Sequence, residues 1–137
     1  MASETRSLGG PAGIADVLDA LFHVPSTPNI GRDAAVKACL RVLREQNVPV
    51  QRLLVTDQPV RRGSLFDASG VRVPFPPGRE FERSFVGLAD PEPAARWAHP
   101  AHWVFVPAEG AAHAVVAPTT LPQHPNTSAH FLPADST

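Results

Sequence analysis

Apolar residues recur at the spacing of an amphipathic helix in two stretches of the N-terminal third of the chain. The first stripe, within 13–24, consists of Ile14, Val17, Leu18, Leu21 and Phe22. The second, which begins near Asp33, consists of Val36, Cys39, Leu40 and Leu43. Pro25 follows the first stripe, and Asn47 with Pro49 follows the second. We therefore predict two helices that end at these residues.

Beyond the second stripe, apolar and polar residues alternate, which is typical of strands. Single strands are predicted at 50–56 and 83–89, and hairpins are predicted at 63–75 and 102–118. The sequences "DASG" and "AEG" supply residues that tolerate turn dihedral angles at the two hairpin tips. Asp90 followed by Pro91 resembles an N-cap and a first helical position, so we expect a short helix there.

This order of elements predicts a single α+β domain over 13–117. Its two N-terminal amphipathic helices would pack on one face of a mainly antiparallel sheet of about five to six strands. One alternative is that 34–57, a helix feeding a strand, resembles one unit of an α/β sheet. The rest of the chain does not continue that alternation, so we favour α+β.

The two ends of the chain have a different composition from the domain. Residues 1–12 are small and polar, which predicts a flexible N-terminus. Residues 118–137 contain four prolines and show no apolar period, which predicts an extended proline-rich tail. We therefore expect the domain to stay folded when this tail is removed.

Length and cysteine content restrict the class of protein. The chain has 137 residues, which suits one domain with its own core. Its single cysteine, Cys39, cannot form an internal disulfide, so a reducing cytoplasm is the expected location. We see no apolar signal segment and no stretch long enough to span a membrane. The abundance of arginine, alanine and proline fits a high-GC bacterium or its phage.

The charge of the chain argues against a nucleic-acid partner. Twelve basic and thirteen acidic residues give a formal net charge of −1, whereas nucleic-acid binding rests on a positive surplus. Six arginines fall within 52–83, among four acidic residues. We interpret this stretch as a solvated face.

The histidines between Trp97 and His113 suggest metal chemistry but lack its spacing. His99 and His102 flank Pro100, so they cannot share a helix face as the ligands of HExxH do. We expect His102 to lie opposite residues 117–118 and His113 close to the turn, too far apart for one ion. His124 or His130 could complete a site with His99 and His102. We predict no bound metal and no cofactor.

The aromatic residues of 97–107 predict packing instead of catalysis. Trp103 and Phe105 share one face of the predicted strand, and Val104 and Val106 share the other, so the strand is apolar on both faces. Such a strand either lies under a second layer or contacts a partner. Cys39 falls on a buried stripe, and we find no nucleotide, calcium or nucleophile-elbow motif.

The sequence thus favours a non-catalytic interaction or assembly subunit that binds a protein partner or itself. The expected contact residues are apolar or aromatic, namely Trp97, Trp103, Phe105, Leu121, Phe131 and Leu132. The alternative is a small-molecule-binding or enzymatic domain. Its polar groups would be His99 and His102, with Asp57 or Glu109.

Overall fold

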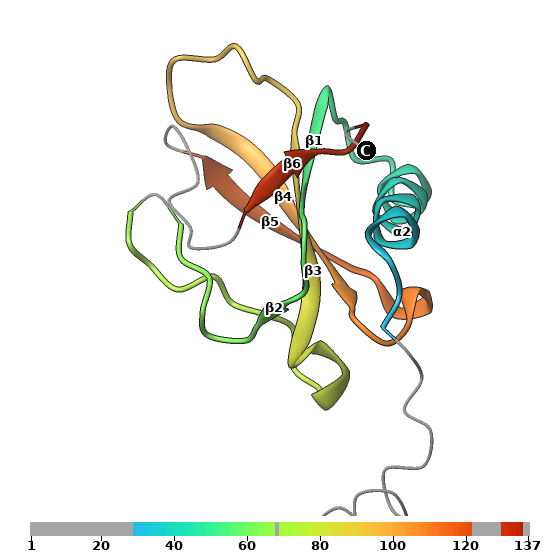
Figure 1. Cartoon of the computed structure of the whole chain (residues 1–137). Coiled ribbons are helices and arrows are strands. Elements are labelled where there is room, and N and C mark those ends of the chain that lie inside the picture. Colours follow the sequence, from blue (N-terminus) through green and yellow to red (C-terminus); the bar gives the residue numbers. More distant parts are fainter. Residues whose placement is uncertain (1–28, 68, 122–129, 136–137) are drawn as a thin grey trace, which may run out of the picture.

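The computed structural model describes residues 29–67, 69–121 and 130–135, and it has the predicted α+β architecture (Figure 1). Its elements are α2 (Arg32–Glu45), β1 (Arg52–Thr56), β2 (Val60–Arg61), the 3-10 turn η2 (Arg79–Phe81), β3 (Arg83–Asp90), β4 (His99–Pro107), the 3-10 turn η3 (Ala111–His113), β5 (Val115–Leu121) and β6 (Phe131–Pro133). Five strands lie in the order β5-β4-β3-β1-β6, with β2 paired to β3, and every pairing is antiparallel. The helix predicted at 13–24 lies outside the described residues.

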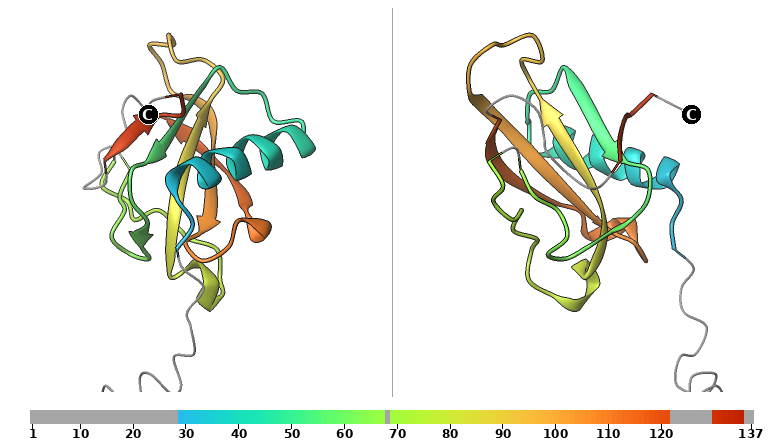
Figure 2. Two further views of the ribbon diagram at one scale, coloured as in Figure 1. Left: turned by 45° about the vertical axis from the view of Figure 1, so that its right-hand side comes forward. Right: turned by 60° about the vertical axis from the view of Figure 1, so that its left-hand side comes forward.

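Helix α2 crosses one face of the sheet (Figure 2). Asp33 in its first turn and Arg44 in its last turn both suit the helix dipole. The predicted stop is confirmed: Asn47 has a φ of 55°, and the N–H of Val48 donates to the carbonyl of Leu43 at 2.9 Å. No described helix has the length and apolar character needed to cross a membrane.

The buried stripe of α2 meets the sheet in one core cluster. Its helix side consists of Ala35, Val36, Ala38, Cys39, Val42 and Leu43. The sheet side includes Leu53, Val55, Phe85, Val104 and Val106. Leu40, which we expected on the buried stripe, is 41% exposed. It lies at the rim of the helix face, because the buried arc is centred on Ala35, Cys39 and Val42, and Leu40 falls just beyond the edge of that arc.

The opposite face of the sheet is covered by the segment that follows β2. The residues of this segment that enter the core are Leu65, Val73, Phe75 and Phe81, and Val60 of β2 joins them. They pack on Trp103 and Phe105 of β4, and the rings of Phe75 and Phe105 lie 5.0 Å apart. Strand β4 is therefore central, with a layer on each face, which is the first of the two arrangements that its sequence allowed.

The turn "DASG" is confirmed as the tip of a narrow hairpin. The Asp67 carboxylate accepts hydrogen bonds from the N–H groups of Ser69 and Val71, at 2.8 and 2.9 Å. Gly70 has a φ of 81°, a conformation that costs glycine little. The flanks of the turn form only an isolated bridge between Phe66 and Arg72 instead of two full strands.

The short helix expected from Asp90 is wrong. Asp90 is the last residue of β3, and the residues after it form bends and turns. Its carboxylate accepts from the N–H of Glu92 at 2.9 Å, which is an Asx turn. An N-cap and an Asx turn use the same hydrogen bond to a nearby N–H, so the local sequence does not separate them.

Parts of the predicted proline-rich tail belong to the sheet. The expected domain end at 117 falls inside β5, and β6 pairs with β1 through Leu54↔Pro133, Val55↔Leu132 and Thr56↔Phe131. The Arg32 guanidinium donates to the carbonyls of Leu132 and Pro133, at 2.9 and 2.8 Å. The start of α2 thus holds β6, whose contacting residues lie 100 and 101 positions further along the chain. The described residues of the predicted tail therefore form parts of two strands instead of an extended tail.

We expect Cys39→Ser to lower the free energy of unfolding by about 1–3 kcal/mol, because it places a hydroxyl in an apolar core. Cys39 is fully buried, and burial raises the pKa of its thiol to about 12, so little reactive thiolate exists at neutral pH. Urea denaturation of both proteins measures the loss. Unchanged stability with a lost activity would instead make Cys39 a nucleophile.

Candidate functional site

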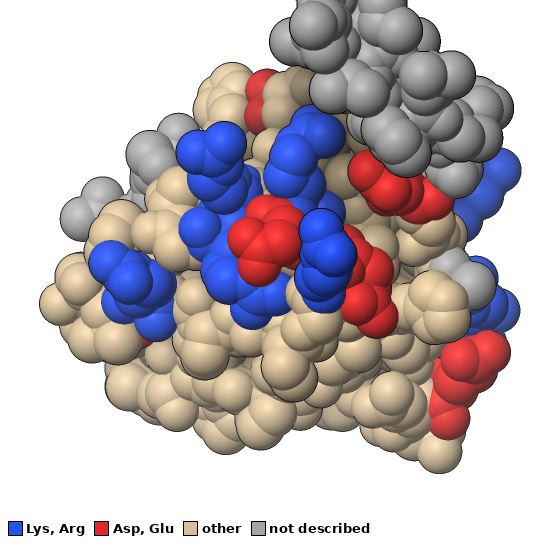
Figure 3. Space-filling view, turned by 90° about the horizontal axis from the view of Figure 1, so that it is seen from below, with Lys and Arg blue, Asp and Glu red and all other residues tan. Residues whose placement is uncertain are grey.

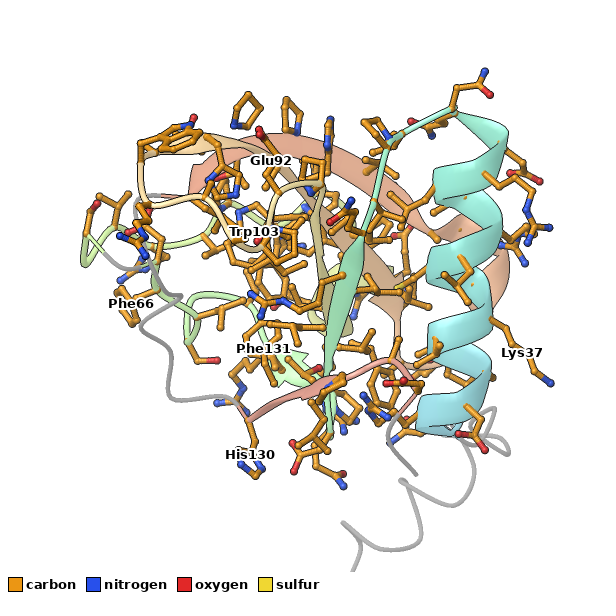
Figure 4. The ribbon with its side chains drawn as sticks, turned by 90° about the horizontal axis from the view of Figure 1, so that it is seen from above. Lys37, Phe66, Glu92, Trp103, His130 and Phe131 are labelled. Carbon is orange, nitrogen blue, oxygen red and sulfur yellow. The ribbon has the colours of Figure 1, made fainter. Side chains whose placement is uncertain are left out.

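The predicted contact residues divide between the core and the surface. Trp103, Phe105 and Leu121 are buried in the cluster under the segment that follows β2. Phe131 and Leu132 are half-buried in β6. The ring of Phe131 lies 6.3 Å from that of Trp103, so this aromatic pair closes one edge of the core (Figure 4). Only Trp97 is largely open to solvent, at 64% exposed.

Trp97 is one of three exposed apolar side chains that lie on two loops. It lies in the connection between β3 and β4, whereas Phe66 and Val71 flank the hairpin tip at Asp67 and are 37% and 60% exposed. Both loops extend on the side of the sheet away from α2 (Figures 1 and 4). We call Phe66, Val71 and Trp97 the loop face. Sequence reasoning missed Phe66 and Val71, although their place beside "DASG" was a signal that both lie at a hairpin tip.

Phe66 is held by a cation–π contact. The guanidinium carbon of Arg72 lies 5.9 Å from the centre of the Phe66 ring, and the two residues form the backbone bridge of the hairpin. Such a contact contributes about 0.5–1 kcal/mol at an exposed position. The hairpin therefore presents an aromatic ring in a defined orientation.

A buried pair of polar side chains anchors the Trp97 loop, residues 91–98. Asp90 ends β3, His99 begins β4, and both side chains are 5% exposed. The Nε2 of His99 lies 2.7 Å from Oδ1 of Asp90, and its Nδ1 lies 3.0 Å from the carbonyl oxygen of Trp97. The other carboxylate oxygen of Asp90 lies 3.7 Å from Arg52 of β1. The loop is thus fastened by the two residues that flank it.

The environment of His99 favours its charged form. The carbonyl of Trp97 and the carboxylate of Asp90 both raise the pKa of the imidazole above its usual 6.5, with a further electrostatic contribution from Glu92, and burial opposes them. Because its two ring nitrogens are engaged, His99 has no free position for a ligand or for general-base chemistry.

The polar residues of the alternative hypothesis are not brought together. His99 and His102 lie three residues apart in β4, so they point to opposite faces of the sheet. The register His102↔Pro118 confirms the expected partner of His102. Asp57 follows β1 at the other end of the sheet, about 17 Å from Arg52 at 3.3 Å per residue. Glu109 follows β4 at that same far end, where it is exposed.

Asp57 has a different partner from those predicted. Its Oδ2 lies 3.4 Å from Nδ1 of His130, and its N–H donates to the His130 carbonyl at 2.9 Å. The two residues lie at an open hollow of about 320 Å³, which Arg61 and Ser64 also line. His130 is 75% exposed and points outward (Figure 4). This hollow could take a small polar molecule, but it is shallow and gives no enclosed place for a reaction.

Within 29–67, 69–121 and 130–135, no three or more His, Cys, Asp or Glu side chains gather as they would around a metal ion. The end of the sheet near η2 carries interleaved charges of both signs (Figure 3). There Arg62 pairs with Glu82, and Arg79, Glu80 and Arg83 line a small hollow. Alternating charges of this kind give no continuous track for a phosphate backbone.

Comparison of the chain with protein-family models, with curated proteins and with solved structures finds no match.

Proposed function

We propose that the protein is an interaction or assembly subunit whose contact surface is the loop face of Phe66, Val71 and Trp97. The exposure of Trp97 carries this proposal. An indole buries a large apolar area when a partner covers it, and tryptophan is enriched among the residues that dominate binding energy. The loop that presents Trp97 is fastened at both ends by Asp90 and His99. A residue on a fastened loop loses less backbone entropy on binding than a residue on a flexible loop.

A partner that adds a strand to the sheet fits less well than one that contacts the loops. Strand β5 is the longer edge strand, with seven residues, and Pro118 lies in its middle. Proline offers no N–H to a new strand, and it is one of the residues by which natural sheets protect an edge. Side-chain contacts through the loop face do not need a free edge.

The second candidate is a small-molecule site at the Asp57–His130 hollow. A carboxylate beside an imidazole is a pair that can bind a polar ligand or move a proton. The exposure of His130 and the openness of the hollow argue against catalysis, because solvent screens charges there. We therefore rank this candidate second. The cytoplasmic location inferred from the lone cysteine is part of the same proposal.

We expect Trp97→Ala to weaken the association of the protein with its partner or with itself by about 10- to 100-fold. The full chain should be isolated under native conditions from its own cells, and the mass of its complex measured for wild type and variant. Lys37→Ala is the control, because Lys37 projects from the exposed side of α2 (Figure 4). A monomer with a bound metabolite that Asp57→Asn removes would favour the second candidate and contradict the first.

A further inference from the structure

His99 faces hydrogen-bond acceptors with both of its ring nitrogens. One acceptor is the carboxylate of Asp90, and the other is the backbone carbonyl of Trp97. Neither group can donate, so the imidazole must donate twice. A neutral imidazole carries one N–H and the imidazolium carries two. The observed geometry is therefore satisfied only when His99 holds both protons.

The neighbouring charges are arranged to keep that second proton. Asp90 of β3 contacts the ring directly, and Glu92 of the loop adds a further negative charge nearby. Arg52 of β1, 3.7 Å from the far oxygen of Asp90, is a positive charge and acts in the opposite direction. Strand β5 places the apolar Leu121 opposite His99 and adds no charge there. Arg96, the remaining charged residue of the loop, is exposed.

We propose that Asp90 and His99 form a proton-dependent clamp that fixes the position of Trp97. When His99 loses a proton to solvent, the remaining N–H stays with Asp90, because a hydrogen bond to a carboxylate is stronger than one to a neutral carbonyl. The Nδ1 lone pair then faces the Trp97 oxygen at 3.0 Å. Two acceptors at that distance repel each other, so the backbone at Trp97 is released. His99 is thus a positioning residue for the loop face.

The sign of the effect follows from the direction of the pKa shift. The pKa of His99 is raised in the folded protein, so its contribution to stability is fully present below the ordinary value of 6.5. That contribution is lost as the pH rises through the folded value. The loop is therefore clamped at acidic pH and released as the pH rises through the folded pKa, which lies above 6.5. The consequence for binding rests on the function proposed above, whereas the response of the loop does not.

A pH titration of the full chain labelled with 5-fluorotryptophan tests the clamp. Trp97 and Trp103 give two fluorine resonances, which Trp97→Phe assigns, and the ring carbon signals of His99 report its own titration. We expect the Trp97 resonance to shift with the same midpoint as His99, above 6.5. The resonance of Trp103 should not move at that midpoint, since Trp103 is buried in the core.

His99→Gln should abolish the pH response of Trp97, whereas His113→Gln, which changes an exposed histidine of η3, should leave it unchanged. If His99→Gln does not fold, the wild-type titration decides alone. A Trp97 resonance that stays constant through the His99 midpoint, or a His99 midpoint at or below 6.5, would overturn the clamp. A Trp97 resonance that shifts with His99, while the association of the protein with its partner or itself stays constant over the same pH range, would uphold the clamp and contradict the proposed function.

Discussion

A chain that ends at Ala117 should lose at least about 3 kcal/mol of its free energy of unfolding, or fail to fold. The cut removes the second half of β5 and all of β6. It also removes Leu121, which is buried, and Phe131, whose ring packs on Trp103. Each apolar side chain of this size stabilises the fold by about 1.5–3 kcal/mol when it is fully buried.

Backbone contacts add to the expected loss. The N–H of Ala134 donates to the carbonyl of Leu53 at 2.9 Å, and the carbonyl of His130 accepts from Asp57. Without β6, strand β1 becomes an unprotected edge, and the Arg32 guanidinium loses the carbonyls of Leu132 and Pro133. This expectation reverses the one from the sequence, which treated the segment as a removable tail.

Urea denaturation of the chains 1–117, 1–135 and 1–137 measures the effect. The chain 1–135 is the control, because it keeps β6 and every described residue. It should unfold at nearly the same urea concentration as the full chain. A 1–117 chain with that same midpoint would show that β6 contributes nothing to the fold.

The two tryptophans should respond to substitution in opposite ways. Trp103→Ala should lower the free energy of unfolding by about 3–5 kcal/mol, because it leaves a cavity between β4 and the segment that covers it. Trp97→Ala should change stability by no more than about 0.5 kcal/mol, because Trp97 makes few contacts at 64% exposure. The pair thus compares the same substitution at a core and at a surface position.

Denaturation monitored by circular dichroism suits both variants, since neither depends on tryptophan emission for the readout. Equal losses at the two positions would mean that the Trp97 loop folds onto the core in solution. A small loss at Trp103 would mean that the segment after β2 does not cover β4, and would favour the second arrangement that the sequence allowed, in which this strand contacts a partner.

The local period of the chain predicted the antiparallel strands β1, β3, β4 and β5, but not β2 or β6. Alternation along 102–118 predicted the two apolar faces of β4, and the position of the turn "AEG" predicted the partner of His102. The end of the helix at Asn47 could also be predicted, because a residue in the left-handed conformation and a following proline end a helix through local effects.

The contacts between distant segments could not be predicted in this way. Proline is disfavoured in the middle of a central strand, but Pro118 and Pro133 lie in edge strands, where a missing N–H is tolerated. Nothing near Phe131 indicates that its partner is β1, and nothing near Arg32 indicates that it holds β6. Composition therefore suggested a tail where the fold has an edge strand.

Contacts between distant segments also explain why the candidate site could be predicted only in part. Sequence reasoning grouped Trp97, Trp103 and Phe105 because they are close in the chain. Which of them is exposed depends on the segment after β2, and that segment lies elsewhere in the sequence. His99 was noticed as a titratable residue, but its partner Asp90 was assigned to a helix cap instead.

Site-specific photo-crosslinking in the protein's own cells tests the contact surface most directly. A photoreactive phenylalanine analogue should replace Trp97, Phe66 or Lys37 in turn within the full chain. Positions 97 and 66 should form the same covalent adduct, with a partner or with a second copy, whereas position 37 on α2 should not (Figure 4). An adduct at position 37 and none at positions 97 and 66 would contradict the assignment of the loop face as the contact surface.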